Sequence, residues 1–344
     1  MRLTQVPSNE SRNASQAPLI SVVVPTRDRP ASLSRCLTAL AAQTVSDVLE
    51  VIVVDDGSTA PAAIVAVTHQ HRFARLIRVQ HAGPAAARNA GARTARAKIL
   101  CFTDDDCEPA ARWAEALARA IEAGADAAAG RTLSADPGSA VAAAAEIVAE
   151  APAVASASSP GTLSFAPTNN LACRAEVLAA VPFDERYRAA AGEDREWCAR
   201  LGAAGYLLHA EPGAELVHRP NETLRAFLRQ QVRYGRGAYR FRTFGAGRGL
   251  EPPIFYARLI RRGFDRGATV GLLVCVAQIA TAIGFISEWG VLRAAAPKIT
   301  PNPLGDGRQA DEMVDDMKGQ RGSGEGRPAS AQEHAIERMV EHED

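Results

Sequence analysis

Several features are scarce or missing in this sequence of 344 residues, and each narrows what the protein can be. Its six cysteines form no C-x-x-C pair, which is unlike a zinc framework or a disulfide scaffold and suits a reducing cytosol. The 39 basic and 39 acidic residues cancel, so the charge excess of a general nucleic-acid-binding protein is missing, and we expect no nucleic-acid partner.

The N-terminal segment lacks the apolar stretch of a secretory signal. Residues 1–17 are polar and show no periodicity, so we predict a disordered leader there. The catalytic part of the chain should therefore stay in the cytoplasm. With 47% hydrophobic residues, the remaining sequence can bury a sizeable core.

Short β-branched runs alternate with segments of helical spacing over the first 124 residues. The runs predict strands at 19–25, 51–54, 75–80 and 98–103. The segments that follow them predict helices at 31–43, 61–70, 83–97 and 109–124. This alternation is typical of βαβ units, and it predicts an α/β fold with a mainly parallel, Rossmann-like sheet flanked by helices.

Polar clusters follow three of these strands: "TRDR" after the first, "DDGS" after the second and "DDD" after the fourth. Because ligands of such sheets bind at the carboxyl ends of the strands, we treat the three clusters as one candidate site. Between 125 and 182 the chain is rich in alanine, and its secondary structure stays unassigned.

The acidic cluster of Asp104, Asp105 and Asp106 ends the fourth strand. Like charges this close repel, and a hard divalent cation would offset that repulsion. Taken alone, the three aspartates are explained equally well by a solvated acidic loop that binds no metal. The D-x-D nucleophile of haloacid-type phosphatases is a weaker one, since Glu108 stands where those enzymes carry threonine.

Two further acidic motifs have ordinary structural explanations when taken singly. "VVDDGST" at 53–59 fits a turn and a helix cap as well as a contact to a base or ribose. Glu193 and Asp194 open an amphipathic helix, where acids commonly interact favourably with the helix dipole. The functional alternative at this second motif is a general base that takes a proton from an acceptor hydroxyl.

Taken together, six stretches resemble the family 2 nucleotide-sugar glycosyltransferases, which have the GT-A fold. The stretches are "SVVVPTRDRPASLSRCLTALAAQ", "VIVVDDGST", "GPAAARNAGA", "ILCFTDDDCEP", "GEDREWCARLGAAGY" and "RQQVRYGRG". Their order and approximate spacing match that family from about Leu19 to about Tyr239. "QQVRY" resembles the family's Q-x-x-R-W motif with Tyr in place of Trp, which argues against a polysaccharide synthase of the cellulose type.

The resemblance implies a role for individual residues of the chain. The donor-binding residues would be Pro25, Thr26, Asp56, Arg88, Asp105 and Arg233. The metal ligands, for Mg²⁺ or Mn²⁺, would be Asp104 and Asp106 together with His218. The catalytic base would be Asp194. The acceptor and sugar side would be lined by Asn170, Glu193, Gln230 and Tyr234.

The activity that follows is an inverting transfer of a sugar from a nucleotide-diphosphate donor to a hydroxyl acceptor, in cell-envelope or lipid-linked glycan synthesis. The rival is a non-catalytic nucleotide-sugar-binding or scaffold protein on the same fold. A nucleotidyltransferase fits less well, because "PTRDRP" is not a Gly-rich phosphate loop.

The C-terminal third contains an uncharged stretch at 267–287, preceded by Arg258, Arg261, Arg262 and Arg266. As a helix it is about 30 Å long, which matches a bilayer core. Three arrangements are open. The helix would span the membrane with the catalytic domain on the cytoplasmic face, or it would lie on that face in contact with inner-membrane lipid. In the third arrangement it would pack on a domain that stays in the cytoplasm. We therefore divide the chain into a leader (1–17), a GT-A domain (18–245), a basic linker with this apolar helix (246–290) and a disordered tail (291–344).

Overall fold

The structure is a computed structural model that describes residues 4–5, 18–155, 161–188, 191–219, 223–244 and 251–295. The leader predicted at 1–17 lies outside the described residues except for the two-residue strand β1 (Thr4–Gln5), which pairs antiparallel with β4. Residues 296–344, the greater part of the predicted tail, also lie outside them.

The first half of the sheet is parallel, as the alternation of strands and helices predicts. Its strands are β2 (Ile20–Thr26), β3 (Leu49–Asp56), β4 (Ala74–Val79) and β5 (Ile99–Phe102), in the spatial order β4-β3-β2-β5. Every residue of β3 is buried. Covered on both faces, these strands need apolar side chains at successive positions, which explains their continuous β-branched runs.

Helices α1 (Pro30–Ala41), α2 (Pro61–His69) and α3 (Pro84–Thr94) connect these strands, and each begins with proline. Proline suits the first turn because its missing N–H would have no helical partner there. Successive side chains of a strand point to opposite faces. Accordingly, Val22 and Val24 pack with α1, α2 and α4 (Trp113–Glu122) in one core, and Val23 packs with α3 in a second.

Strands from the unassigned segment 125–182 and from either side of it complete a mixed sheet. The further strands are β6 (Cys107–Pro109), β7 (Ala127–Ser134), β8 (Thr162–Leu163), β9 (Leu171–Arg174) and β10 (Leu208–His218). β9 runs antiparallel to both β5 and β7, and β10 pairs parallel with β7 and antiparallel with β6. Helices α6 (Ala175–Ala180) and α7 (Glu193–Ala203) contribute to the second core.

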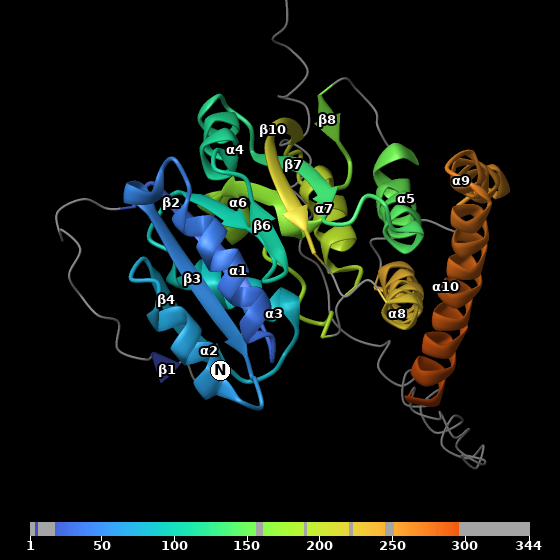
Figure 1. The fold of residues 1–344 in the computed structure, drawn as a ribbon, viewed down its shortest axis with the longest axis horizontal. Coiled ribbons are helices and arrows are strands. Elements are labelled where there is room, and N and C mark those ends of the chain that lie inside the picture. Colours follow the sequence, from blue (N-terminus) through green and yellow to red (C-terminus); the bar gives the residue numbers. More distant parts are fainter. Residues whose placement is uncertain are drawn as a thin grey trace, which may run out of the picture. The chain divides into compact units, whose positions relative to one another are not determined.

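Four helices form a separate layer beside the sheet. They are α5 (Ala140–Ala155), α8 (Leu224–Thr243), α9 (Pro253–Asp265) and α10 (Ala268–Ala295). Ile147, Phe227, Leu259 and Val274 belong to the third hydrophobic core, which lies between them. Figure 1 shows α5 and α8 next to the sheet and α10 on the side away from it. The predicted apolar helix is therefore real and continues to Ala295.

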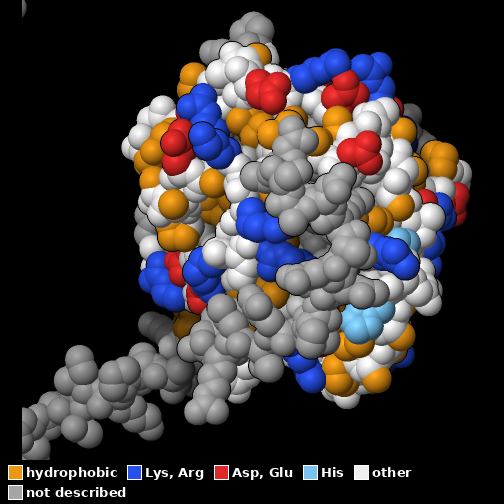
Figure 2. Space-filling view, turned by 90° about the vertical axis from the view of Figure 1, so that its left-hand side faces the viewer, with side chains coloured by type: hydrophobic (Ala, Val, Ile, Leu, Met, Phe, Trp, Pro, Cys, Tyr) orange, Lys and Arg blue, Asp and Glu red, His pale blue; other side chains and the backbone are white. Residues whose placement is uncertain are grey.

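Acidic and basic side chains lie interspersed among apolar ones on the face shown in Figure 2. This mixture is in keeping with the equal numbers of acids and bases in the whole chain.

Candidate active site

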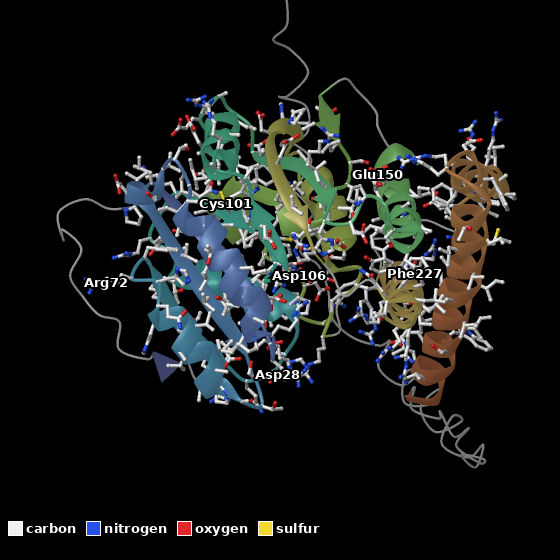
Figure 3. All side chains as sticks on the ribbon, viewed as in Figure 1. Asp28, Arg72, Cys101, Asp106, Glu150 and Phe227 are labelled. Carbon is white, nitrogen blue, oxygen red and sulfur yellow. The ribbon has the colours of Figure 1, made fainter. Side chains whose placement is uncertain are left out.

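The carboxyl ends of the parallel strands bring the candidate residues together. β2 ends at Thr26 and β3 at Asp56, while the loop of Asp104–Asp106 follows β5. Figure 3 shows Asp106 between the N-terminal strand–helix units and α8. The sheet geometry thus places the three polar clusters at one edge, as in other open α/β sheets.

Arg29 holds two of the three clustered acids. Its Nη2 lies 2.6 Å from Oδ1 of Asp105, its Nη1 donates to Oδ2 of Asp106 at 2.7 Å, and its Nε donates to Oδ2 of Asp105 at 3.1 Å. Asp105 also accepts a hydrogen bond of 2.7 Å from Thr26 Oγ1. Burial raises the pKa of Asp105 to about 7 despite the nearby guanidinium, because the carboxylate is fully desolvated. Asp105 and Asp106 are thus tied to the end of β2 and to the loop after it.

The third acid, Asp104, belongs to a second network. The Arg88 side chain is buried on α3 and donates from Nη2 to Asp104 at 2.8 Å and from Nη1 to Glu193 at 3.1 Å. Glu193 in turn accepts from the backbone N–H of Ala191 at 2.9 Å. A buried guanidinium with two carboxylate partners is charge-compensated and fixed in position. It links the loop after β5 to the start of α7, which is 105 residues away from Arg88 along the chain.

Asp194 follows Glu193 on α7 and accepts a hydrogen bond of 2.7 Å from the backbone N–H of Arg195. Burial, together with the negative charge of Glu193, raises the pKa of Asp194 to about 7. Tyr234 on α8 lies near it: desolvation and the charge of Asp194 raise the pKa of this tyrosine to about 12. Gln230 donates to the Tyr234 hydroxyl at 2.8 Å. The structure thus brings the Glu-Asp motif and the Q-x-x-R-Y motif together.

His218, at the end of β10, lies close to Asp106. Its Nε2 is 3.5 Å from Oδ1 of Asp106, and the ligand atoms of Asp106, Cys107 and His218 all lie within 4.8 Å of one another. Burial favours neutral Asp106, but His218 and Arg29 outweigh it and hold the pKa of Asp106 below its ordinary value. Burial also lowers the proton affinity of His218, yet its contact with Asp106 leaves the pKa of the imidazole raised.

This donor set fits a hard divalent cation. Burial raises the pKa of the Cys107 thiol well above its usual range, so Cys107 is a neutral thiol in the metal-free protein. The carboxylate oxygens of Asp106 are ligands of the kind that hard cations such as Mg²⁺ and Mn²⁺ prefer, and the His218 imidazole adds a nitrogen ligand common in metal sites. Asp104 lies outside this cluster and is bound to Arg88.

Asp56 uses both carboxylate oxygens to hold the loop after β4. Oδ1 accepts from the N–H of Ala82 at 2.8 Å, and Oδ2 accepts from Gly83 at 3.0 Å and from His81 Nδ1 at 2.8 Å. Arg27 Nη1 donates to His81 Nε2 at 2.7 Å, so the ring proton sits on Nδ1. Asp56, the predicted donor-binding acid, is thus part of a hydrogen-bonded series that runs from Arg27 through His81 to Asp56.

The remaining predicted residues occupy different surroundings. Pro25 is half-buried in β2, and Arg233 is exposed on α8. Asn170 is buried: its Oδ1 accepts from Trp113 Nε1 at 2.8 Å and its Nδ2 donates to the Ala214 carbonyl at 3.0 Å. Its predicted contact with a sugar stays a prediction.

Sequence reasoning missed Arg29, His81 and Arg27. Two of them lie in the quoted "TRDRP" stretch, where two arginines at a strand end are a signal for anion or carboxylate contacts. His81 carries no such signal, because it stands alone one position after the third strand.

Comparisons with known proteins agree with this geometry. The family model described as "Glycosyl transferase family 2" matches residues 21–168. Glycosyltransferase AglE of Haloferax volcanii is 31% identical over 229 residues, which cover 65% of this chain and 74% of that protein. The pre-mycofactocin glycosyltransferase of Mycobacterium tuberculosis is 30% identical over 226 residues, or 64% of this chain. The match covers 46% of that relative, so the chain spans about half of its length.

Among solved structures, the mannosyltransferase PcManGT from Pyrobaculum calidifontis, in complex with GDP-Man and Mn²⁺, is similar to 85% of this chain. The match covers 83% of that protein, with a TM-score of 0.51 and 20% sequence identity. At that identity the likeness concerns the fold, and it supports the GT-A architecture expected from the sequence. The family model and the AglE match go further and show that the chain belongs to glycosyl transferase family 2.

Proposed function

We propose that this glycosyltransferase moves a sugar from a nucleoside-diphosphate donor to a hydroxyl acceptor with inversion at the anomeric carbon. One observation carries the proposal: Arg88 joins Asp104 to Glu193, at 2.8 and 3.1 Å. A single buried cation therefore fixes the distance between the acidic loop, where a diphosphate would sit, and the helix end that carries the candidate base, Asp194.

The leaving group develops negative charge at the acidic loop. Asp106 and His218 would hold Mg²⁺ or Mn²⁺, and the bound ion would supply Lewis-acid chemistry to the diphosphate, while Asp104 stays paired with Arg88. Arg233 is exposed and forms no ion pair within the described part of the chain, so its guanidinium is available for a phosphate oxygen. Thr26 and Arg29 keep Asp105 in place beneath this group.

Asp194 is the candidate general base. The acceptor oxygen attacks the anomeric carbon, and the bond from that carbon to the diphosphate oxygen breaks with its electron pair going to the diphosphate. The acceptor proton passes to Asp194 Oδ2, since Oδ1 accepts from the backbone. A carboxylate whose pKa is raised to about 7 is well matched to this task near neutral pH.

The acceptor proposed is a glycan or a lipid-linked hydroxyl of the cell envelope, at the cytoplasmic face of the membrane. Its support is the apolar helix α10, which packs directly on α8, the helix that carries Gln230, Arg233 and Tyr234. A site built on that helix lies near whatever surface α10 contacts.

A donor screen tests the proposal. Purified protein is incubated with nucleotide sugars and Mn²⁺, beginning with GDP-mannose because the structural relative binds GDP-Man, and release of nucleoside diphosphate is scored. We expect release with at least one donor, loss of release in Asp106→Ala, and a rate lower by about 10² or more in Asp194→Asn. Asp47→Asn, an exposed acid elsewhere on the surface, is the matched control and should match the wild type.

Two outcomes would contradict the proposal. Full activity of Asp194→Asn would remove the base assignment, and full activity of Asp106→Ala in the presence of a chelator would remove the metal site. Nucleotide-sugar binding without any release or transfer would instead favour a binding or scaffold protein on the same fold.

A further inference from the structure

The outward face of α10 carries a regular row of large apolar side chains, here called the outer row: Leu272, Val276, Ile279, Ile283 and Ile286. These residues are 42–62% exposed and recur at intervals of four and three, which places them on one side of the helix. Within the described residues one helix, Ala268–Leu292, is long and apolar enough to span a membrane. Its length alone does not decide whether it crosses a bilayer or lies along one.

The opposite face of α10 is in backbone contact with α8. A Cβ atom on Gly235 would lie 1.9 Å from the carbonyl oxygen of Thr281, and one on Gly284 would lie 2.0 Å from that of Val232. Glycine on both helices therefore permits an approach that any other residue would prevent. These contacts tie the middle of α10 to the middle of α8.

Polar contacts secure the C-terminal part of α10 to the same helix. Arg240 Nε donates to Oε1 of the buried Glu288 at 2.7 Å, and Arg236 Nε donates to Ser287 Oγ at 3.3 Å. Breaking the Arg240 contact would leave the Glu288 carboxylate buried without its partner, which is strongly destabilising. The helix is thus fixed to α8 over several turns.

Because α10 is attached to α8, a transmembrane α10 would have to bring α8 into the bilayer with it. α8 carries six arginines, at positions 225, 229, 233, 236, 240 and 242. Charged groups inside a bilayer core are costly, and non-helical connections there lack partners for their backbone groups. α10 can therefore meet lipid with its outer row while α8 stays outside the hydrocarbon.

The neighbouring helix α9 adds positive charge to the same surface. Its exposed face carries Ile254, Arg258, Arg261 and Phe264, together with the single acid Asp265. Among the described residues Arg258 and Arg261 form no ion pair, whereas Arg262 pairs with Glu150 and Arg266 pairs with Glu146. Phe264 packs across Gly271, so the face of α9 continues into that of α10.

We propose that the outer row of α10 and the exposed face of α9 dock on an anionic lipid bilayer, with α10 lying in the plane of the surface. The apolar row enters the headgroup–acyl boundary while Arg258 and Arg261 contact lipid phosphates, as expected for an interfacial amphipathic helix. Trp289, exposed at the far end of α10, belongs to the residue type enriched at this depth.

A second copy of the chain is the other occupant to consider, because spacing by four and three also suits a helix pair. Charge favours lipid: a two-fold pairing of these faces would place the two unpaired arginines of one copy against an equally basic surface. Docking on lipid does not depend on the proposed function. The functional meaning of docking, which is to hold α8 and its Gln230–Tyr234 segment above the bilayer, rests on the proposed function.

The test uses the full chain and co-sedimentation with vesicles, measured without donor or acceptor. Wild-type protein should sediment with phosphatidylcholine–phosphatidylglycerol vesicles and less with phosphatidylcholine alone. Ile279→Gln with Ile283→Gln should lower binding at least tenfold, and Arg258→Gln with Arg261→Gln should remove the preference for the anionic lipid. Leu207→Gln, equally exposed on the sheet side, is the matched control and should bind as the wild type does.

Alkaline carbonate extraction of cell membranes separates lying from spanning. Release of the wild type supports the in-plane arrangement, and retention would overturn it. A second copy would be favoured by two results together. The wild type would not bind vesicles, and light scattering would show a dimer that the double variant Ile279→Gln with Ile283→Gln abolishes. These results would overturn the lipid proposal. Sugar transfer to a soluble acceptor, measured separately, reports on the proposed function and not on docking.

Discussion

Asp194 is a half-buried carboxylate, and its protonation should be visible in the pH dependence of the reaction. Burial raises its pKa to about 7. A base works only when deprotonated, so we expect the rate to rise with pH through about 7, to level off above it, and to fall about tenfold for each unit below it. The measurement is kcat against pH with a saturating donor. A rate that stays flat across this range would exclude Asp194 as the base.

Arg29 occupies two carboxylates of the acidic cluster, and a divalent cation would compete with its guanidinium for them. We therefore expect Arg29→Ala to bind Mn²⁺ about tenfold more tightly, which corresponds to about 1.4 kcal/mol. Calorimetric titration with Mn²⁺ alone measures this. Arg35→Ala is the control, because Arg35 is also basic and nearby but pairs with Glu108 at 3.4 Å. Weaker Mn²⁺ binding in Arg29→Ala would show that the two cations do not compete.

The residues of the candidate site differ in how far the sequence reveals them. Asp56 and Asp104–Asp106 could be placed at one edge because each follows a buried parallel strand. The partners of these acids could not be predicted. Arg88 reaches Glu193 across 105 residues, and Arg29 reaches Asp105 across 76, so both contacts depend on loop paths that no local pattern encodes.

At the scale of secondary structure elements, the contact between α8 and α10 makes a sharp prediction about stability. Gly235→Ala would force a Cβ atom against the Thr281 carbonyl, so we expect a loss of about 1–3 kcal/mol in the free energy of unfolding. The matched control is Gly202→Ala in α7, where nothing lies within 4 Å of the added Cβ and better helix propensity should stabilise by up to about 1 kcal/mol. Denaturant unfolding measures both, and equal effects would contradict the close packing.

The first strands and helices were predictable because their periodicity is clear. For example, α2 was expected at 61–70 and spans Pro61–His69. The segment 125–182 could not be assigned for a physical reason: small apolar alanines recur both in helix α5 and in the buried strands β7 and β9, so the sequence shows no distinct period that separates them. Their antiparallel pairings depend on the whole sheet and not on local sequence.

For the whole molecule, metal and nucleotide should act together on stability. A ligand that binds the folded state at about a hundred times its Kd adds about 2.7 kcal/mol. We therefore expect nucleoside diphosphate with Mn²⁺ to raise the melting temperature by about 5–10 °C. Removing the metal with a chelator should abolish most of this shift. A shift of the same size in the presence of chelator would mean that the nucleotide binds without a cation.

The close approach at Gly83 links distant parts of this architecture. Gly83 has φ +96°, and a Cβ there would lie 2.1 Å from the backbone oxygen of Arg188. The loop at Ala82 and Gly83, which Asp56 holds by hydrogen bonds, therefore contacts the backbone at Arg188 in the segment before α7 and Asp194. The hydrogen atom of Gly83 sets the spacing between these two segments, and any larger side chain would push the Ala82–Gly83 loop away from the backbone at Arg188.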